Sequence, residues 1–295
     1  MSEIKKEDIK QEVFDLYDDY AHNRITRTDF IKRLSFFAVG SLSLPSLMGF
    51  LMPDYKSNIQ IGADDPRITE TFIEYQSPKG AGTIKALLCV PKDNKGKLGG
   101  VVVVHENRGL NPHIEDVARR TALAGFVSLA PDALSALGGY PGNDDEGREM
   151  QSKRDRNEML EDFIAAAEYL KKSEYCNGKM GVVGFCFGGW ISNMMATRIP
   201  DLAAAVPFYG GQAPVEEVPN INASLQLHFA ELDTNVNKGW PAYEEALKAN
   251  KKEYTAYIYP NANHGFHNDT TPRYDKEAAE LAWERTVSFF TDKLK

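Results

Sequence analysis

The sequence predicts an α/β fold with a mostly parallel eight-stranded sheet, flanked by helices and preceded by an N-terminal helical arm. From about residue 66 onward, short apolar runs alternate with helical patterns, as in proteins whose parallel strands are joined by helices. The run Val101–Val104 contains four consecutive valines, and a strand without polar alternation is typical of a sheet covered on both faces. We divide the chain into an arm over residues 1–60 and an α/β domain over residues 61–295.

Composition narrows the classes of function. The 295 residues include 42 acidic and 34 basic side chains, a net charge of −8, which argues against a nucleic-acid partner. Hydrophobic residues make up 42% of the chain, which fits a folded domain. The three cysteines are too few for a disulfide framework, and no zinc-type cysteine pair is present.

The arm begins with two predicted helices. Residues 4–22 place apolar side chains on one helical stripe, namely Ile9, Val13, Leu16, Tyr17 and Tyr20. Thr26 is the expected N-cap of a second helix, with Asp29 three residues further on.

An uncharged run from Leu34 to Met52 follows and has three interpretations. The phrase RTDFIKRL before it resembles a twin-arginine export signal, but the pair here is Arg27-Thr28 and no A-x-A cleavage site follows. The run is near membrane-spanning length, but serines, glycines and Pro45 weaken an anchor. We favour retained helices that pack on the domain or on a second subunit. A cytoplasmic location is accordingly favoured over periplasmic export through a degenerate leader.

The domain is predicted to open with an antiparallel hairpin formed by Thr71–Gln76 and Thr83–Val90. Six further strands are expected at Val101–His105, Phe126–Leu129, Lys179–Gly184, Ala203–Phe208, Ser224–Phe229 and Tyr254–Tyr259. Helical patterns lie at 113–124, 145–172, 188–198, 240–250 and 274–293. The glycine-rich loop 131–147 follows a strand end, where such sheets form their pockets.

Cys186 is the candidate nucleophile. It is the centre of a G-x-C-x-G motif, Gly184 to Gly188, between an apolar strand and a helical pattern. A nucleophile elbow needs small residues at these positions because the turn is tight. A thiolate at a helix N-terminus is stabilised, and the backbone N–H of Phe187 is free to hold an oxyanion. The alternative is a core cysteine beside a glycine-rich turn. We interpret Cys89 as a core residue and Cys176 as a loop thiol.

Two strand ends supply a candidate acid and base. Asp233 follows the run SLQLHF, and His264 follows the next run, so both are expected at the same edge of the sheet as Cys186. His228 lies within an apolar strand and is expected in the core. His267 is a candidate second polar group of the pocket, and a metal site built on His264 and His267 lacks a recognisable third ligand.

The loop after Val101–His105 adds Glu106 and Arg108. Glu106 has three interpretations: it pairs with the thiol, it holds Arg108, or it is exposed. Arg108 and His267 are the candidate substrate contacts, and a backbone N–H of this loop is the expected second oxyanion donor.

Four motifs together resemble the dienelactone hydrolase (carboxymethylenebutenolidase-like) family of the α/β-hydrolase fold: HENRGLNPHIEDVARR, GFCFGG, HFAELD and NHGFHND. The resemblance covers about residues 66–295. It implies a catalytic domain with Cys186 as nucleophile, His264 as base and Asp233 as orienting acid. It further implies that Glu106 pairs with the resting cysteine and that Asn107 and Phe187 donate N–H groups to the oxyanion.

Two features depart from this family. Its arginine shortly after the catalytic histidine is missing, with Asn268 near the expected place and Arg273 further on. The arm is also absent from smaller members, whereas longer members carry a twin-arginine-like leader.

We therefore expect hydrolysis of a small lactone or ester, with no cofactor and no metal. The alternatives are a broad carboxylesterase or thioesterase on the same site, or a non-catalytic scaffold. Homo-oligomers assembled through the arm are a further expectation.

Overall fold

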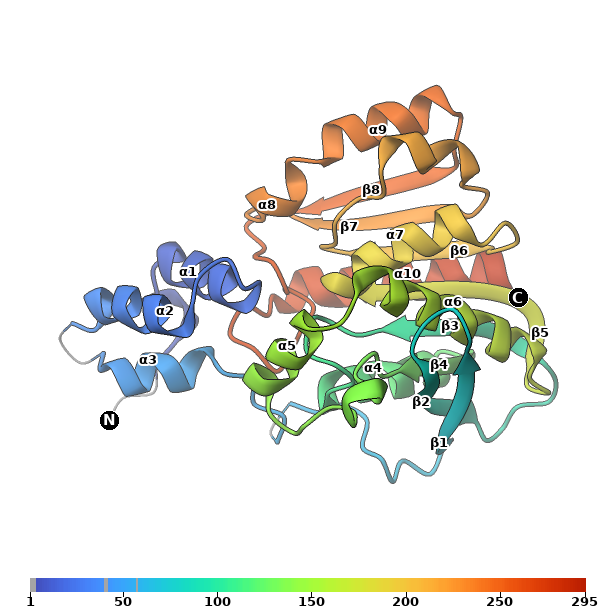
Figure 1. Ribbon diagram of the computed structural model, residues 1–295, viewed down its shortest axis with the longest axis horizontal. Coiled ribbons are helices and arrows are strands. Elements are labelled where there is room, and N and C mark those ends of the chain that lie inside the picture. Colours follow the sequence, from blue (N-terminus) through green and yellow to red (C-terminus); the bar gives the residue numbers. More distant parts are fainter. Residues whose placement is uncertain (1–3, 40–41, 57) are drawn as a thin grey trace.

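Eight strands form one twisted sheet at the centre of the molecule (Figure 1). The computed structural model describes residues 4–39, 42–56 and 58–295. The strands are β1 (Ile68–Ser77), β2 (Gly82–Pro91), β3 (Leu98–Val104), β4 (Val127–Pro131), β5 (Cys176–Phe185), β6 (Ala204–Phe208), β7 (Ser224–Ala230) and β8 (Tyr254–Tyr259). Their spatial order is β1-β2-β4-β3-β5-β6-β7-β8. The hairpin β1–β2 and the pair β2–β4 are antiparallel and all other pairs are parallel, which confirms the predicted fold class.

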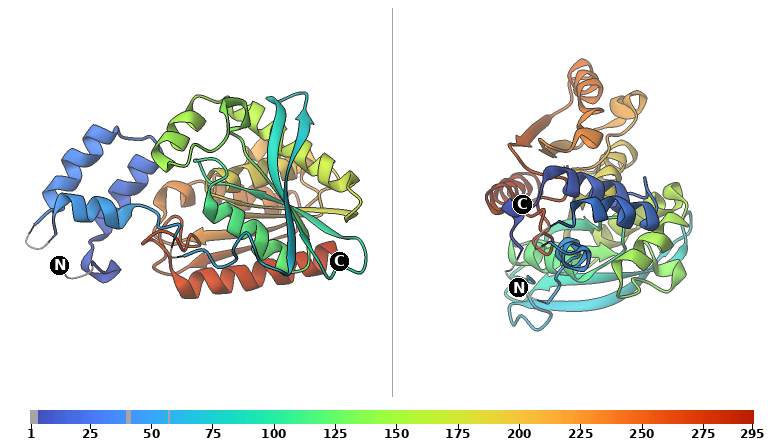
Figure 2. Two further views of the ribbon diagram at one scale, coloured as in Figure 1. Left: turned by 90° about the horizontal axis from the view of Figure 1, so that it is seen from below. Right: turned by 90° about the vertical axis from the view of Figure 1, so that its left-hand side faces the viewer.

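Helices cover both faces of the sheet (Figure 2). The helices of the domain are α4 (Pro112–Leu123), α5 (Asp144–Ser152), α6 (Arg156–Lys172), α7 (Phe187–Arg198), α8 (Thr234–Asn237), α9 (Trp240–Ala249) and α10 (Lys276–Leu294), with short 3-10 turns η3 (Ser135–Leu137) and η4 (Val215–Asn220). Val102 and Val104 of β3 belong to the core on the side of α6 and α7, whereas Val101 and Val103 belong to the core on the side of α4 and α10. The run of valines is therefore buried on both faces, as its sequence predicts.

Two local predictions need correction. The helical pattern 145–172 divides into α5 and α6, because Asp155 caps a new helix by accepting hydrogen bonds from the N–H groups of Asn157 and Glu158. Cys176 is not a loop thiol: it begins β5 and is 2% exposed, among apolar side chains of the core. Cys89 is buried, as predicted.

The arm folds around a small core of its own. It contains η1 (Lys6–Asp8), α1 (Gln11–Ala21), α2 (Arg27–Leu34), η2 (Ser35–Phe37) and α3 (Leu44–Leu51). The five residues of the predicted stripe are all buried, and Thr26 caps α2 by accepting from the N–H of Asp29. Tyr20 and Phe30 stack with ring centroids 4.5 Å apart. Gly40 and Ser41 of the uncharged run lie outside the described residues. No described helix combines the length and apolar character needed to cross a membrane.

The arm lies beyond the carboxyl ends of the parallel strands, beside α5 (Figures 1 and 2). Polar contacts from the end of α1 attach it to the domain. Asn107 Nδ2 donates to the carbonyl of Ala21 at 2.5 Å, and Arg148 donates to the carbonyl of Tyr20. Arg273 pairs with Asp18 at 3.4 Å. The last turn of α1 is therefore held at the edge of the sheet where pockets form.

The separate core of the arm gives a testable expectation. Phe30→Ala removes a ring that is fully buried between α1 and α2. The variant should lower the free energy of unfolding of the arm by about 3–5 kcal/mol. Hydrogen exchange of arm amides should accelerate strongly, while amides of the central sheet keep their protection. Phe36→Ala is the matched control, because that ring is 75% exposed. Equal loss of protection in arm and sheet would contradict an independently packed arm.

Candidate active site

Cys186 occupies a strained turn between β5 and α7. Its backbone has φ 56° and ψ −110°, a conformation that L-residues rarely adopt. A Cβ atom on Gly184 would lie 2.0 Å from the carbonyl oxygen of Gly188. A Cβ atom on Gly188 would lie 2.4 Å from the carbonyl oxygen of Val104. The two glycines of the motif therefore allow the turn to close, and the thiol stands at the N-terminus of α7.

His264 and Asp233 come together beside this turn. Asp233 follows β7 and His264 follows β8, and His264 Nδ1 is 2.6 Å from Asp233 Oδ2. Both side chains are at least 92% buried. Among the described residues, His264 Nε2 has no hydrogen-bond partner. The structure thus brings three sequence-predicted residues to one edge of the sheet, with one imidazole nitrogen left available.

A second histidine contacts the thiol, and sequence reasoning missed it. His22 Nε2 lies 3.1 Å from Cys186 Sγ. His22 is the C-cap residue of α1, and its Nδ1 lies 2.8 Å from the carbonyl oxygen of Asp18. No local motif surrounds His22, so the sequence signal was limited to its place at the end of an amphipathic helix. The arm therefore contributes directly to this site.

The electrostatics of the cluster favour charged forms. Burial opposes the thiolate, but His22 and His264 lower the pKa of Cys186 to about 6. Burial also opposes the imidazolium of His22, but the thiol and Asp18 raise the pKa of His22 to about 9. The pKa of His264 is raised well above its usual value, because the nearby carboxylates outweigh its burial. At neutral pH these shifts favour a thiolate between two imidazolium rings.

The same three residues could hold a metal ion. One ligand atom each from His22, Cys186 and His264 lies within 4.8 Å of the others. Thiolate and imidazole are zinc ligands, and three protein ligands leave the fourth tetrahedral position open. A metal there would occupy the sulfur atom, so the thiol cannot be a metal ligand and a nucleophile at the same time.

Glu106 is neither exposed nor bonded to the thiol, two of its three expected positions. It is 4% exposed, so it is not a solvated side chain. Its carboxylate accepts a hydrogen bond from Asn268 Nδ2 at 3.1 Å, whereas the bond to the thiol comes from His22. Burial disfavours the Glu106 carboxylate, but Arg108 and other cations outweigh this effect and lower its pKa. Glu106 therefore stays ionised beside Asn268.

The two candidate substrate contacts lie elsewhere. Arg108 is buried and pairs with Asp144 at 2.8 Å, underneath the arm. His267 is buried and stacks on Phe185 with centroids 5.0 Å apart. Neither side chain lines the cavity beside Cys186. Burial in ion pairs and ring stacks, which the sequence does not reveal, removes both from contact with a substrate. His228 lies in the core, as predicted.

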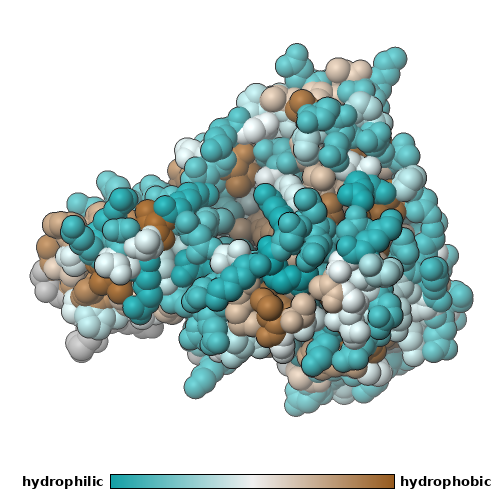
Figure 3. All heavy atoms as spheres, in the orientation of Figure 1, coloured by the Kyte–Doolittle hydropathy of each residue, from teal (hydrophilic) through white to brown (hydrophobic). Residues whose placement is uncertain are grey.

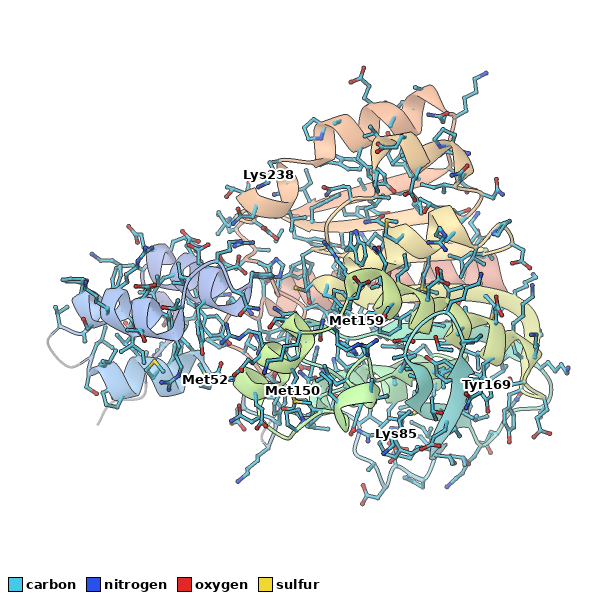
Figure 4. All side chains as sticks on the ribbon, viewed as in Figure 1. Met52, Lys85, Met150, Met159, Tyr169 and Lys238 are labelled. Atoms are coloured by element: carbon cyan, nitrogen blue, oxygen red, sulfur yellow. The ribbon has the colours of Figure 1, made fainter. Side chains whose placement is uncertain are left out.

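A cavity of ≈ 630 Å³ opens onto Cys186, and its walls are rich in cations. Arg24, Arg148, Arg154, Arg156 and Lys238 line it, together with apolar side chains such as Met159 and Trp190. Met159 on α6 and Lys238 after α8 are labelled in Figure 4. Strongly hydrophilic side chains gather at the centre of this face, beside the arm (Figure 3).

Arg156 differs from the other cations of the cavity. Its guanidinium lies over the ring of Trp190, 3.5 Å from the centroid. No carboxylate among the described residues forms an ion pair with it. Arg156 can therefore pair with an anionic ligand, whereas Arg154 is bound to Asp162 at 3.0 Å.

Comparisons with known proteins identify the family to which this chain is similar. A family model described as "Dienelactone hydrolase family" matches residues 84–294, and one described as "YqhI-like" matches residues 1–39. The "Putative hydrolase fragment YghX" of Escherichia coli K12 is 54% identical over 110 residues, covering 37% of this chain and 94% of that protein. A "Putative carboxymethylenebutenolidase" of Saccharolobus solfataricus is 30% identical over 244 residues, covering 70% and 93%.

A solved structure supports the same assignment. A "Putative Dienelactone Hydrolase" from Klebsiella pneumoniae shares 26% identity, covers 76% of this chain and 99% of its own, and superposes with a TM-score of 0.66. The mostly parallel sheet with flanking helices is thus the α/β-hydrolase fold.

The close contact between Gly184 and Gly188 predicts that a Cβ atom at residue 184 destabilises the protein. Gly184→Ala should destabilise the protein by at least about 2–3 kcal/mol, because the new Cβ meets backbone atoms that cannot move aside. Gly96→Ala is the control, since a Cβ there meets nothing within 4 Å. Thermal unfolding measures both, and equal stability of the two variants would contradict the tight turn.

Proposed function

The chain belongs to the dienelactone hydrolase family and is a hydrolase, and from this premise we propose that it cleaves small esters or lactones through Cys186. The observation that carries the proposal is the convergence of Cys186 with the bonded pair Asp233–His264 at three strand ends. A thiol nucleophile requires a base within reach and a group that orients the base. Asp233 orients His264, and the unpartnered Nε2 of His264 is the nitrogen that such a base would use.

Acylation begins when the Cys186 thiolate attacks the substrate carbonyl. A carbon–sulfur bond forms and the electron pair of the C=O bond moves onto oxygen. As the carbonyl reforms, the carbon–oxygen bond of the ester breaks, and the leaving alkoxide takes the proton of His264 Nε2. For a lactone the alcohol stays attached to the acyl group. The products of this half-reaction are a thioester on Cys186 and a neutral His264.

Deacylation reverses the proton transfer. Water gives a proton to His264 Nε2 as its oxygen attacks the thioester carbon. The carbon–sulfur bond then breaks, the electron pair returns to Sγ, and a carboxylic acid leaves. Thiolate and protonated His264 are restored, so ester plus water has become acid plus alcohol.

Backbone N–H groups of Asn107 and Phe187 stabilise the oxyanion in this mechanism. Phe187 is the first residue of α7, and Asn107 lines the same cavity. In the described part of the chain, neither N–H donates to a carbonyl group. Removal of one such donor costs other enzymes about 2.7–4 kcal/mol of transition-state stabilisation.

The cationic cavity favours a substrate that carries a negative charge. Arg156 has no acidic partner among the described residues, and its guanidinium lies over the ring of Trp190. A carboxylate on the substrate would satisfy this guanidinium with charge-assisted hydrogen bonds. We therefore assign small anionic esters or lactones as the preferred class.

The proposal is tested by hydrolysis of p-nitrophenyl acetate and of a dienelactone. Cys186→Ala should lower kcat/KM by at least about 10³-fold, because the attacking atom is removed. Cys176→Ala is the matched control: this buried thiol lies outside the cavity, so its loss affects stability more than turnover. Full activity of the Cys186→Ala variant on both substrates would refute the assignment.

The charge of the substrate gives a separate expectation. Arg156→Gln should raise KM for p-nitrophenyl hemisuccinate about 10-fold or more and leave KM for neutral p-nitrophenyl butyrate unchanged, since hydrogen bonds to charged groups contribute about 1.5–3 kcal/mol. Lys85→Gln, labelled in Figure 4, removes one exposed charge outside the cavity and should change neither value. An equal effect on both esters would show that Arg156 does not recognise the anion.

A further inference from the structure

The structure assigns a second imidazole to the active site: we propose that His22 of the N-terminal arm, oriented by Asp18, holds the Cys186 thiolate as an ion pair in the resting enzyme. The proposal rests on the proposed function of Cys186 and adds a residue from outside the 84–294 segment that matches the hydrolase family. His22 touches the reacting sulfur atom, and it is therefore a catalytic residue. His264 remains the group that exchanges protons with substrate and water.

The hydrogen bonds of His22 determine which nitrogen carries a proton. Nδ1 lies 2.8 Å from the carbonyl oxygen of Asp18, and a carbonyl only accepts, so Nδ1 carries a hydrogen. Nε2 lies 3.1 Å from Cys186 Sγ. Two arrangements satisfy this contact: a neutral pair in which the thiol donates to Nε2, or an ion pair in which Nε2–H donates to the thiolate.

The surroundings favour the ion pair. The Asp18 carboxylate lies 3.2 Å from His22 Nδ1, and His22 stands at the C-terminus of α1, where a cation is stabilised. Cys186 stands at the N-terminus of the twelve-residue helix α7, where an anion is stabilised. The pKa of Cys186 is lowered to about 6 and that of His22 is raised to about 9, in the direction that this arrangement requires.

Other charged groups around the pair come from both the arm and the domain. Facing it are Asp18 and Arg24 from the arm, His264 and Asp233 from the loops after β8 and β7, Arg273 from the segment before α10, Arg156 from α6 and the phenol of Tyr209 after β6. Arg24 and Arg273 bind the Asp18 carboxylate at 2.9 and 3.4 Å. Burial alone would raise the pKa of Asp18, but His264, His22 and Arg273 lower it and keep the carboxylate ionised.

His22 takes the place that the family resemblance gives to a glutamate. Glu106 accepts a hydrogen bond from Asn268, and the bond to the sulfur comes from His22. A carboxylate beside the sulfur keeps a resting thiol neutral, whereas an imidazolium beside it stabilises the thiolate. The resting enzyme is therefore expected to hold a reactive thiolate before any substrate binds.

The two imidazoles then have separate tasks. In the resting enzyme both nitrogens of His22 are engaged, whereas His264 Nε2 is free to exchange a proton. When the sulfur attacks, its electron pair enters the carbon–sulfur bond, and the hydrogen on His22 Nε2 stays on that nitrogen. When that bond breaks, the electron pair returns to sulfur and the ion pair forms again.

The residues on either side of His22 are held by the domain. The carbonyl of Ala21 accepts from Asn107 Nδ2, and Arg148 donates to the carbonyl of Tyr20 and, at 2.8 Å, to Asn23 Oδ1. His22 itself is 20% exposed at the cavity wall. Through these hydrogen bonds, the docking of the arm positions the imidazole of His22 beside Cys186.

The test is the pH dependence of alkylation of Cys186 by iodoacetamide, in the full-length protein without substrate and located by mass spectrometry. The wild type should show a midpoint near pH 6. His22→Gln keeps a hydrogen-bonding side chain but loses the charge, so the midpoint should rise by at least about one pH unit. The alkylation rate at pH 6 should then fall at least about 5-fold, and the rise of kcat/KM with pH should shift equally.

Two further variants separate charge from structure. Lys32→Gln removes an exposed charge of the arm and should leave the midpoint unchanged. In His22→Gly, added imidazole should restore alkylation at pH 6, which a purely structural role of His22 would not allow. If His22→Gln keeps the wild-type midpoint while Cys186→Ala is inactive, the ion pair is wrong and the hydrolase mechanism stands. If Cys186→Ala is fully active, both are wrong.

Discussion

The active site depends on burying one negative charge. Cys186 is 8% exposed, and the removal of a thiolate from water must be offset by positive partners nearby. The tight turn supplies the N-terminus of α7, and the strand ends supply His264, but the closest partner comes from the arm. His22 is itself 20% exposed and pairs with Asp18, which also pairs with Arg24 and Arg273. A continuous series of charged contacts therefore connects Cys186 of the domain with His22 and Asp18 of the arm.

Much of the fold and part of the site could be predicted from sequence. The valine run, the hairpin and the strand–helix alternation all reflect local patterns, and the residues at strand ends meet because parallel strands share one edge. His22 could not be placed this way, because it is 164 residues from Cys186 and no topological rule fixes where an added helix docks. The docked arm also covers Arg108, whereas His267 is buried by a ring stack within the domain, and the sequence reveals neither contact.

The arm also explains the sequence departures from the family. Arg273 follows the candidate catalytic histidine, but its guanidinium lies 5.0 Å from the ring centroid of Tyr17 and binds Asp18, so it serves the docked arm. Asn268, near the place where the family resemblance expects an arginine, donates to Glu106. The cation that is available to a substrate is instead Arg156 of α6, which lines the cavity beside Trp190. An available guanidinium on this wall fits the proposal of an anionic substrate.

Docking and charge stabilisation cannot be separated in this arrangement. The Asp18 carboxylate accepts Arg273 from the domain and also orients His22 toward the sulfur, so one ionised group serves both attachment and chemistry. A movement of α1 away from the domain would break the Asp18–Arg273 pair and the contact between His22 and Cys186 at once. The sulfur would then lose its nearest cation, and a buried thiolate without that partner would take up a proton. The reactivity of Cys186 therefore follows the position of the arm, which makes residues far from the family segment part of its catalytic unit.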